Sequence, residues 1–415
     1  MTESMTTSPL CGNALVGQSG GPTAAINATL SGVIRGAREH ACIRTLYGMK
    51  NGMEGFLNEE LVDLNHVFQD ASALSALEQT PAAVLGSCRK KLPQPGENDS
   101  VYETIFALFE KYDIRYFFYI GGNDSMDTVA KISAYARRRG YPIRVMGVPK
   151  TIDNDVCGTD HTPGFGSAAK FIAVTMQEIV RDCHVYTTKA VTIAEIMGRD
   201  AGWLTAAAAL PGYLGGRGPQ LVYLPERPFS YERFFADLRG ALQQRPDVVV
   251  AVSEGIRLED GTYVGASSQS GAVDVFGHQY LAGTGKTLEH AVKREFGCKV
   301  RSVELNVLQR CAAHLNSLCD ITESVAIGKE AVARAVGGSS ARMMGFTRVC
   351  NDPYTVRIVE NDIFEVANRE RPVPDDYINP DANGITPLCA EYLKPLIAGE
   401  CAHVWQNGLP VHFEL

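Results

Sequence analysis

Two loops near the middle of the chain collect side chains suited to proton transfer and to anion binding. Residues 149–155 read Pro-Lys-Thr-Ile-Asp-Asn-Asp, and residues 121–124 read Gly-Gly-Asn-Asp. A carboxylate such as Asp153 can accept a proton, a lysine such as Lys150 can bind an anion, and bare glycine amides let an anion approach the backbone. We therefore predict that these loops form the floor of an active site.

Short buried strands are expected to position both loops. Residues 116–120 form an aromatic and β-branched run that ends at a glycine pair, and residues 143–148 form a second run. The segment between them predicts an amphipathic helix, capped by Ser125 and ended by Gly140. A strand–helix–strand unit makes the two strands parallel, so both loops are expected at the carboxyl edge of one sheet, where such sheets bind ligands.

Glycines and charged side chains also follow the other expected strands. These positions are Gly20-Gly21, Arg89, Arg199, Glu254, Arg301 and Arg310. The turn at residues 17–22 suits a phosphate, but its letters also fit the hydrolase pattern G-x-S-x-G with Ser19 as nucleophile. Only 16 residues precede this turn, too few for the strands that supply an oxyanion hole, so a hydrolase is disfavoured. Arg89, after an expected strand at residues 81–85, could instead lie in a solvated basic run, and Arg199 could form a helix-capping pair with Asp200.

The composition limits the class of protein. The length of 415 residues suits two α/β domains or one large one, and the hydrophobic content of 45% is typical of a globular enzyme. A net charge of −8 argues against a nucleic-acid partner. There is no apolar run long enough for a membrane helix, and the N-terminus does not resemble a signal peptide. Eleven cysteines without a C-x-x-C pair indicate reduced thiols in a cytoplasmic protein and no cysteine-based metal site.

The expected loops together favour phosphoryl transfer. That reaction needs amides and cations for the phosphoryl oxygens, a carboxylate to place Mg²⁺, and a base for the acceptor hydroxyl. The sequence has neither the G-x-G-x-x-G pattern of dinucleotide-binding proteins nor the phosphate loop G-x-x-x-x-G-K-[ST].

The order of these motifs resembles the phosphofructokinase family. The motifs are S-G-G-P, L-G-S-C-R, I-G-G-N-D-S, P-K-T-I-D-N-D, T-P-G-F-G, I-M-G-R, S-E-G and L-Q-R, within residues 12–315. The resemblance implies an α/β fold with two Rossmann-like three-layer domains, parallel-rich sheets and an active site in the cleft between them. We expect a donor-side domain at residues 10–150, a sugar-phosphate domain at 151–340, and a C-terminal extension at 341–415 packed on both. A homodimer or homotetramer is also implied.

The resemblance assigns a role to each matching residue. Asp153 would be the base that takes the proton from the sugar 1-hydroxyl, and Arg199 would stabilise the transferred phosphoryl group. Asp155 would be structural or associated with Mg²⁺. The sugar phosphate, fructose 6-phosphate, would contact Thr151, Ile152, Asp153, Met197, Gly198, Arg199, Glu254, Arg310 and, from a neighbouring subunit, Arg301. The phosphoryl donor would face Gly21, Arg89, Asp124 and Lys150.

Three positions depart from the family pattern. Ala190 stands where a second subunit-crossing arginine is usual, with Lys189 beside it, and Val307 stands where histidine or tyrosine is common. Asn123 occupies the position of the metal-binding aspartate, and a neutral amide holds Mg²⁺ less strongly than a carboxylate.

The phosphoryl donor is expected to be pyrophosphate. Members of the family that use ATP resemble one another in having glycine at the positions of Asp124 and Lys150. The Asp124 side chain would clash with the α-phosphate of ATP in size and in charge, while Lys150 adds a cation for a short, highly charged donor. Asp124 and Lys150 are therefore also expected to be catalytic residues. The alternatives are an ATP-dependent phosphofructokinase or related kinase, and a non-catalytic sensor of sugar phosphates.

Overall fold

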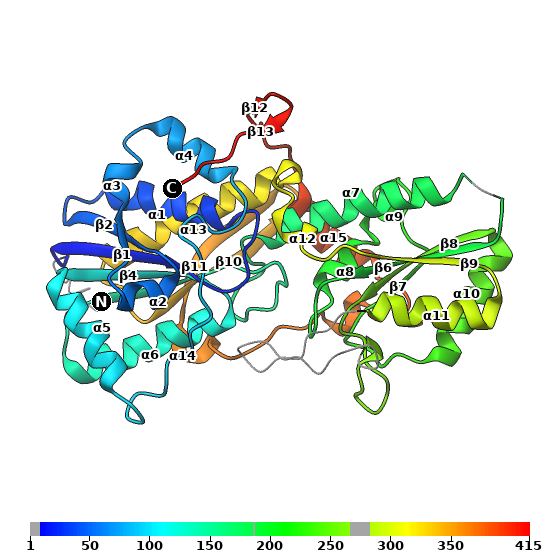
Figure 1. The fold of residues 1–415 in the computed structure, drawn as a ribbon, viewed down its shortest axis with the longest axis horizontal. Coiled ribbons are helices and arrows are strands. Elements are labelled where there is room, and N and C mark those ends of the chain that lie inside the picture. The colour runs from blue at the N-terminus through cyan, green and yellow to red at the C-terminus, as the bar shows by residue number, and fades with distance from the viewer. Residues whose placement is uncertain (1–8, 186, 266–282) are drawn as a thin grey trace.

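The computed structural model describes residues 9–185, 187–265 and 283–415. Two lobes, each built on one sheet, lie side by side (Figure 1). The first lobe has a seven-stranded sheet in the order β11-β10-β5-β4-β1-β2-β3. Its strands are β1 (Gly12–Gln18), β2 (Ile43–Met49), β3 (Leu61–Asp63), β4 (Ile114–Gly121), β5 (Arg144–Pro149), β10 (Arg342–Asn351) and β11 (Tyr354–Asp362). The pairs from β2 through β1, β4 and β5 to β10 are parallel, and the two edge strands are antiparallel.

The second lobe has a four-stranded, all-parallel sheet in the order β7-β8-β6-β9. Its strands are β6 (Ala190–Ile196), β7 (Leu221–Tyr223), β8 (Asp247–Ser253) and β9 (Lys299–Glu304). The longer helices around it are α7 (Phe165–Cys183), α10 (Tyr231–Gln244) and α11 (Thr284–Phe296), with the short α8 (Trp203–Ala207) and α9 (Leu210–Tyr213). The expected α/β class with parallel-rich sheets is confirmed.

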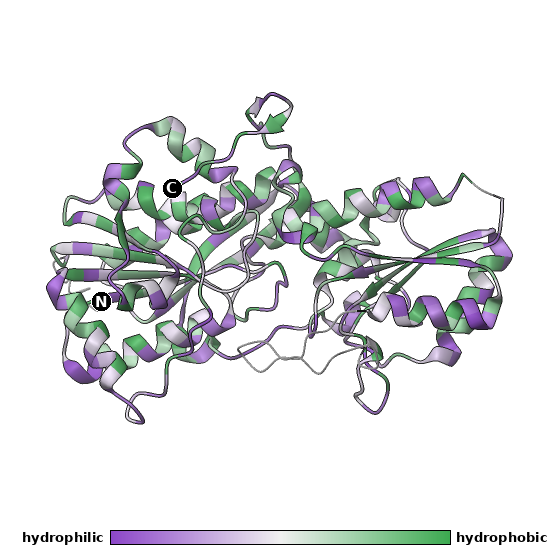
Figure 2. Ribbon diagram, viewed as in Figure 1, coloured by the Kyte–Doolittle hydropathy of each residue, from purple (hydrophilic) through white to green (hydrophobic). Residues whose placement is uncertain are grey.

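Both faces of the first sheet are buried. In β1, Leu15 packs into the core on one face, while Ala14 and Val16 pack into the core on the other. This alternation is the reason a parallel strand reads as an unbroken apolar run. The helices of this lobe are α1 (Ile26–Arg38), α2 (Gly52–Leu57), α3 (Leu64–Val67), α4 (Ala71–Glu78), α5 (Ser100–Lys111), α6 (Asn123–Arg139), α13 (Leu318–Val336) and α14 (Ile363–Val366). Figure 2 shows hydrophobic residues concentrated along the strands and the inner faces of these helices.

Helix α13 packs on the first lobe, although the expected boundary at residue 340 assigns it to the second domain. Its Gly328 meets Gly32 of α1, where a Cβ atom at residue 32 would lie 2.1 Å from the Val325 carbonyl oxygen. Two glycines therefore let the helix backbones touch, and Ile327 and Val332 join the core of the first sheet. The domain boundaries remain a proposal.

The C-terminal region divides between the lobes. Strands β10 and β11, which the sequence analysis does not anticipate, extend the first sheet. Helix α15 (Pro387–Leu393) instead supplies Cys389 and Leu393 to the core of the second lobe. The remaining elements are α12 (Leu308–Cys311), the 3₁₀ turns η2 (Ala313–Leu315), η3 (Asp375–Tyr377) and η4 (Lys394–Ile397), and the hairpin β12 (Trp405–Gln406) with β13 (Leu409–Pro410).

Two local expectations are wrong. Residues 81–85 form a loop, because the N–H groups of Val84 and Leu85 bond to side chains of Asn27 and Gln18 rather than to a strand. Helix α6 begins one turn earlier than expected, with Gly122 as its N-cap, so Ser125 is not a cap. Gly140 does end the helix, in the left-handed conformation expected of a glycine there. Over the ranges that the structure describes, none of the helices is long and apolar enough to span a membrane.

Candidate active site

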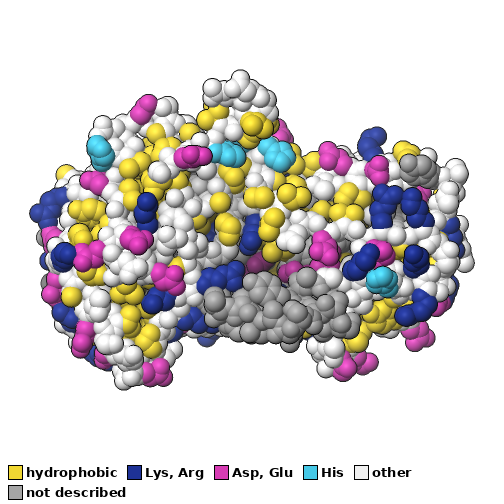
Figure 3. All heavy atoms as spheres, in the orientation of Figure 1, with side chains coloured by type: hydrophobic (Ala, Val, Ile, Leu, Met, Phe, Trp, Pro, Cys, Tyr) yellow, Lys and Arg dark blue, Asp and Glu magenta, His cyan; other side chains and the backbone are white. Residues whose placement is uncertain are grey.

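A cavity of about 620 Å³ lies where the loops of the two lobes meet. It is lined by Gly20, Gly21, Pro22, Arg89, Gly122, Asn123, Asp124, Ser125, Lys150, Thr151, Ile152, Asp153, Asp155, Met197, Arg199, Asp200, Ala201, Glu254, Arg310, Asn368 and Glu370. All predicted site residues except Gly198 and Arg301 are in this set. Elsewhere on the surface, Figure 3 shows Lys and Arg side chains next to Asp and Glu on both lobes.

Lys150 and Asp153 form the floor of the cavity on the loop after β5. The Lys150 side chain is buried and donates a hydrogen bond to the Gly21 carbonyl oxygen. Burial lowers the pKa of Lys150 to about 8, although the carboxylates of Asp153 and Asp155 oppose the shift. Burial raises the pKa of Asp153, and Lys150 and Arg199 pull it in the other direction. The positive charge of Lys150 favours the ionised form of Asp153, but burial has the larger effect on this pKa. A raised pKa makes this carboxylate a stronger base.

The first turn of α6 brings an amide and a carboxylate to the donor side. Asn123 Nδ2 donates to Asp155 Oδ2 at 3.2 Å, and the buried Asn123 Oδ1 has no hydrogen-bond partner. Burial, followed by the charge of Asp153, raises the pKa of Asp155 to about 7. Asp124 lies 3.5 Å from the Lys91 ammonium. Asp124 and Lys150 thus both line the cavity.

Loops of the second sheet complete the opposite wall. Gly198 has a φ of +128°, and its N–H donates to Glu254 Oε1 at 3.3 Å. Gly198 therefore orients a cavity residue without lining the cavity. A Cβ atom at Gly255 would lie 1.8 Å from the Arg199 carbonyl oxygen, so only glycine lets these two loops touch. Burial raises the pKa of Glu254 to about 7, against the hydrogen bond from Gly198.

Arg310 and Arg301 lie in different places. Arg310, on α12, approaches the glycine loop, with its Nη1 3.5 Å from a Cβ atom built on Gly21. It also lines a smaller adjoining cavity of about 480 Å³ with Glu54 and Arg89. Arg301, on β9, lies 3.8 Å from Asp182 of α7 and outside the cavity of its own chain.

Of the departures from the family pattern, Asn123 lines the cavity, whereas Ala190, its neighbour Lys189, and Val307 lie outside it. The Lys189 ammonium is 5.6 Å from the centre of the Phe296 ring, and Val307 is 49% exposed. Ser19, the alternative nucleophile, has its hydroxyl 2.8 Å from that of Ser125. This pairing between two hydroxyls does not supply the base that a hydrolase serine needs.

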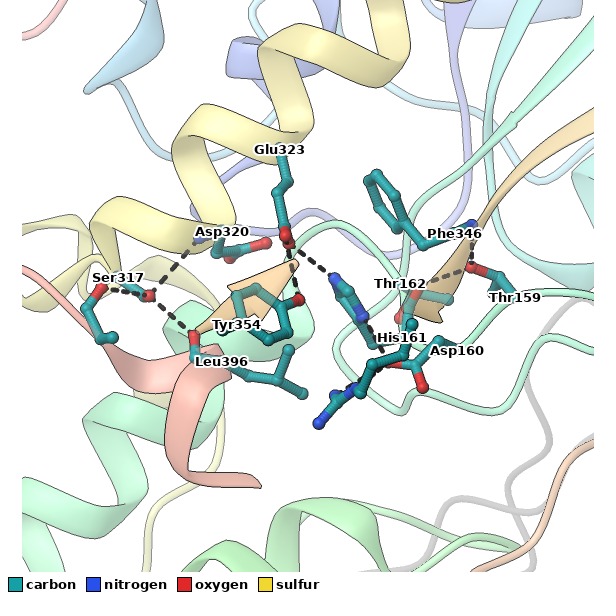
Figure 4. Close-up of polar contacts among 12 residues, drawn as sticks. Thr159, Asp160, His161, Thr162, Ser317, Asp320, Glu323, Phe346, Tyr354 and Leu396 are labelled. Atoms are coloured by element: carbon teal, nitrogen blue, oxygen red, sulfur yellow. Dashed lines mark hydrogen bonds and ion pairs between the residues drawn. The ribbon is translucent and has the colours of Figure 1, made fainter. Parts of the chain in front are cut away.

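A buried cluster of ionisable side chains anchors the loop after β5 (Figure 4). The His161 ring is 2% exposed, with Nδ1 2.9 Å from Asp160 and Nε2 2.7 Å from Glu323 of α13. Burial alone would lower the pKa of His161, but the hydrogen bonds to both carboxylates outweigh it and raise the pKa. Tyr354 of β11 donates to Glu323, and the ring of Phe346 stacks on the imidazole at 4.7 Å. The loop is thereby tied to α13 and to the C-terminal strands.

Sequence reasoning missed two residues of the cavity wall, Asn368 and Glu370. They follow α14, and Asn368 Nδ2 donates to Asp127 of α6 at 3.0 Å. The residue after Asp155, Val156, forms a bridge with Glu370. These residues belong to no motif, and only the packing of the C-terminal region brings them to the cavity.

Comparison with known proteins shows which family the chain resembles over nearly its whole length. The chain matches the phosphofructokinase family over residues 13–334. It is 41% identical to a pyrophosphate–fructose 6-phosphate 1-phosphotransferase of Halomonas elongata, over 96% of this chain and 94% of that protein. It is 42% identical to the protein of the same name in Xanthomonas campestris pv. campestris, over 97% and 96%. A crystal structure of a pyrophosphate-dependent phosphofructokinase from Nitrosospira multiformis superposes with a TM-score of 0.85 at 37% identity, over 96% of this chain and 95% of that one. The chain belongs to the phosphofructokinase family.

Proposed function

We propose that the protein transfers a phosphoryl group from pyrophosphate to the 1-hydroxyl of fructose 6-phosphate, giving fructose 1,6-bisphosphate and phosphate. One observation carries the proposal: a single cavity contains Asp153, Arg199, Lys150 and Asp124. The names of the relatives agree with it. One phosphoanhydride is exchanged for one phosphate ester, so the reaction is expected to run in both directions.

Asp153 is the base in this proposal. It accepts the proton of the sugar hydroxyl as that oxygen attacks the terminal phosphorus, and its raised pKa makes it a better proton acceptor. Arg199, whose buried Nε has no hydrogen-bond partner, is free to stabilise the charge of the transferred group. Lys150 holds the leaving phosphate, since it is a buried cation that contacts the glycine loop at Gly21.

The cavity also fits Mg²⁺, the cofactor that we propose. Asn123 Oδ1 is a buried oxygen without a partner, and Asp155 lies beside it. Mg²⁺ prefers oxygen ligands and commonly takes one or two from protein and the rest from phosphates and water. Within the described ranges, no group of three or more His, Cys, Asp or Glu residues could form an all-protein site. When bound, Mg²⁺ would neutralise charge on pyrophosphate.

The sugar phosphate is proposed to bind on the side of the second lobe. Glu254, Met197 and the backbone of Gly198 lie there, and Thr151 and Ile152 lie beside the base. Arg310, which also lines the cavity, is proposed to bind the 6-phosphate. Because Arg301 lies outside its own cavity, we propose that it serves the cavity of a neighbouring subunit in a homodimer or homotetramer.

Asp124 and Lys150 are proposed to select pyrophosphate, with Gly21 and Arg89 on the same side of the cavity. The free thiols of all eleven cysteines support a reducing compartment, the cytoplasm. We retain the proposed domains at residues 10–150 and 151–340 with an extension at 341–415, although α13 packs on the first lobe.

A donor screen tests the function directly. Formation of fructose 1,6-bisphosphate is measured in a coupled assay with fructose 6-phosphate and Mg²⁺, with either pyrophosphate or ATP as donor. Turnover with pyrophosphate is expected. Turnover with ATP and none with pyrophosphate would contradict the proposal.

A further inference from the structure

A segment of the C-terminal region, residues 370–373, touches both loops that carry the charged groups of the cavity. The N–H of Arg371 donates to the Asp155 carbonyl oxygen at 2.7 Å. The carbonyl of Arg371 accepts from the indole of Trp203 at 3.0 Å, and Trp203 opens α8, just after Arg199. The backbone of one residue thus joins the loop after β5 to the loop after β6.

The side chain of Arg371 acts on the same two loops. Its Nε and Nη2 both donate to the Asn154 carbonyl oxygen, at 3.3 and 3.1 Å. Its guanidinium lies over the Trp203 ring, 4.5 Å from the centroid. Asn154 is fully buried with a φ of +57°, a conformation that is costly unless the surroundings hold it. Because Asn154 stands between Asp153 and Asp155, its conformation sets where both carboxylates point.

Tyr392 of α15 holds the side chain of the same asparagine. Its hydroxyl accepts from Asn154 Nδ2 at 2.9 Å and donates to the Asp160 carbonyl oxygen at 2.7 Å. The other side-chain atom, Asn154 Oδ1, accepts from the Thr162 N–H at 3.0 Å. Arg371 Nη2 also reaches the Tyr392 hydroxyl, at 3.4 Å. Every polar group of the Asn154 side chain therefore has a partner, and the two C-terminal residues contact each other.

A carboxylate extends the link to the second lobe. Glu226 Oε1 accepts from the Gly202 N–H and from the Val373 N–H, each at 2.8 Å. Gly202 is the N-cap of α8. The segment is thus bound to the loop that carries Asp153 and to the loop that carries Arg199.

We propose that Arg371 and Tyr392 are positioning residues that fix the Asn154 turn and thereby the separation of Asp153 from Arg199. This inference rests on the proposed function, in which Asp153 is the base. Arg371 and Tyr392 do not line the cavity, so they act through Asn154 and Trp203 rather than on substrate. Small displacements of a base are costly for turnover but weakly felt in substrate binding.

The test compares Arg371→Lys with Arg369→Lys. Lysine keeps the positive charge at residue 371 but cannot make the forked contact to one carbonyl. Arg369 is an exposed arginine two positions away and serves as the matched control. For Arg371→Lys we expect kcat to fall about tenfold to a hundredfold with both KM values within about threefold. The control should keep the wild-type kcat. An equal kcat in the two variants would overturn the inference.

Tyr392→Phe and the double variant show whether the two residues act through one turn. Both hold Asn154, so the loss of kcat in the double variant should be smaller than the product of the single losses. A full product would mean independent effects and would also count against the proposal.

Hydrogen–deuterium exchange gives a readout without turnover. Exchange in residues 151–163 should rise in Arg371→Lys and not in Arg369→Lys, while the rest of the first sheet keeps its protection. Unchanged exchange would overturn the inference whatever the enzyme does. Wild-type turnover with pyrophosphate and with ATP is measured first. A preference for ATP would contradict the proposed function but not the positioning role. In that case the kcat of each variant is compared with the wild-type kcat with ATP as donor.

Discussion

Asp153→Asn replaces the proposed base with an amide of nearly the same size. The Asp153 N–H bonds to Thr151 Oγ1 at 3.1 Å, and that contact does not depend on the carboxylate. The loop should therefore keep its conformation. Loss of a general base lowers kcat about 10²- to 10⁴-fold, which is roughly 2.7 to 5.5 kcal/mol.

A second effect moves the expected loss towards the upper end of that range. After burial, Asp153 is the largest influence on the pKa of Lys150, and it acts to raise it. With a pKa of about 8, roughly nine in ten Lys150 side chains are protonated at pH 7. Without the charge of Asp153 the pKa of Lys150 falls further, and part of the population becomes neutral. The KM for pyrophosphate in Asp153→Asn should then rise between pH 6 and 8 more steeply than in the wild type.

Steady-state kinetics across this pH range measure both effects. Asp200→Asn is the control, since Asp200 is another carboxylate of the cavity wall but pairs with Arg257. Its kcat should stay within about threefold of wild type, as for other exposed ion pairs. A kcat in Asp153→Asn within tenfold of wild type would refute the assignment of the base. A pH-independent KM for pyrophosphate would refute the electrostatic link to Lys150.

Three further changes probe the donor, the sugar side and the metal. Replacing Asp124 and Lys150 together by glycine should lower kcat/KM for pyrophosphate by about 10² to 10³, because a buried cation at the leaving group is lost, and ATP binding can be followed by calorimetry. Glu254 has a pKa of about 7 in the folded protein against 4.5 in the unfolded chain, so its ionisation costs stability increasingly as pH rises through that window. Glu254→Gln cannot ionise and should raise Tm relative to wild type at pH 8 but not at pH 4.5; an equal difference at both would contradict the shift. Asn123→Asp places a second carboxylate beside Asp155, so it should lower Tm in a chelator and lower the Mg²⁺ concentration needed for half-maximal activity. Unchanged Mg²⁺ dependence would remove residue 123 from the metal site.

The strands that carry the site could be predicted because each is a short apolar run that ends at a polar or glycine-containing loop. Strand β4 and strand β5 follow the expected runs within two residues, and both loops lie at the same edge of the sheet. Parallel pairing follows from the helix between them, so local pattern and chain order suffice. The same reasoning placed Lys150 and Asp153 in one cavity with Arg199 and Glu254.

The C-terminal contribution could not be predicted, because its evidence is not local. Strand β11, at the sheet edge, alternates between partly buried and exposed residues only over its first half, and β10 has a block of buried residues followed by mostly exposed ones, so neither shows a clear strand pattern. The parallel partner of β10, strand β5, lies almost two hundred residues earlier in the chain, and no periodicity encodes such a pairing. Asn368 and Glu370 reach the cavity only because α14 packs against α6 and β10.

Burial is the main cause of the pKa shifts of Lys150, Asp155 and Glu254 in the cavity, and these shifts couple ligand binding to proton uptake or release. Burial shifts Lys150 to a pKa of about 8 and both Asp155 and Glu254 to about 7, so each titrates near neutral pH. A cation at Asp155 would expel its proton, whereas an anion at Lys150 would draw one in. The two ligands should therefore exchange protons in opposite directions, which calorimetry in buffers of different ionisation enthalpy can measure for each. At about pH 7.5, midway between the two pKa values, a pair that arrives together, Mg²⁺ with pyrophosphate, should leave the net proton count of the cavity nearly unchanged. The buried cavity can then be charged correctly for transfer only when both are present.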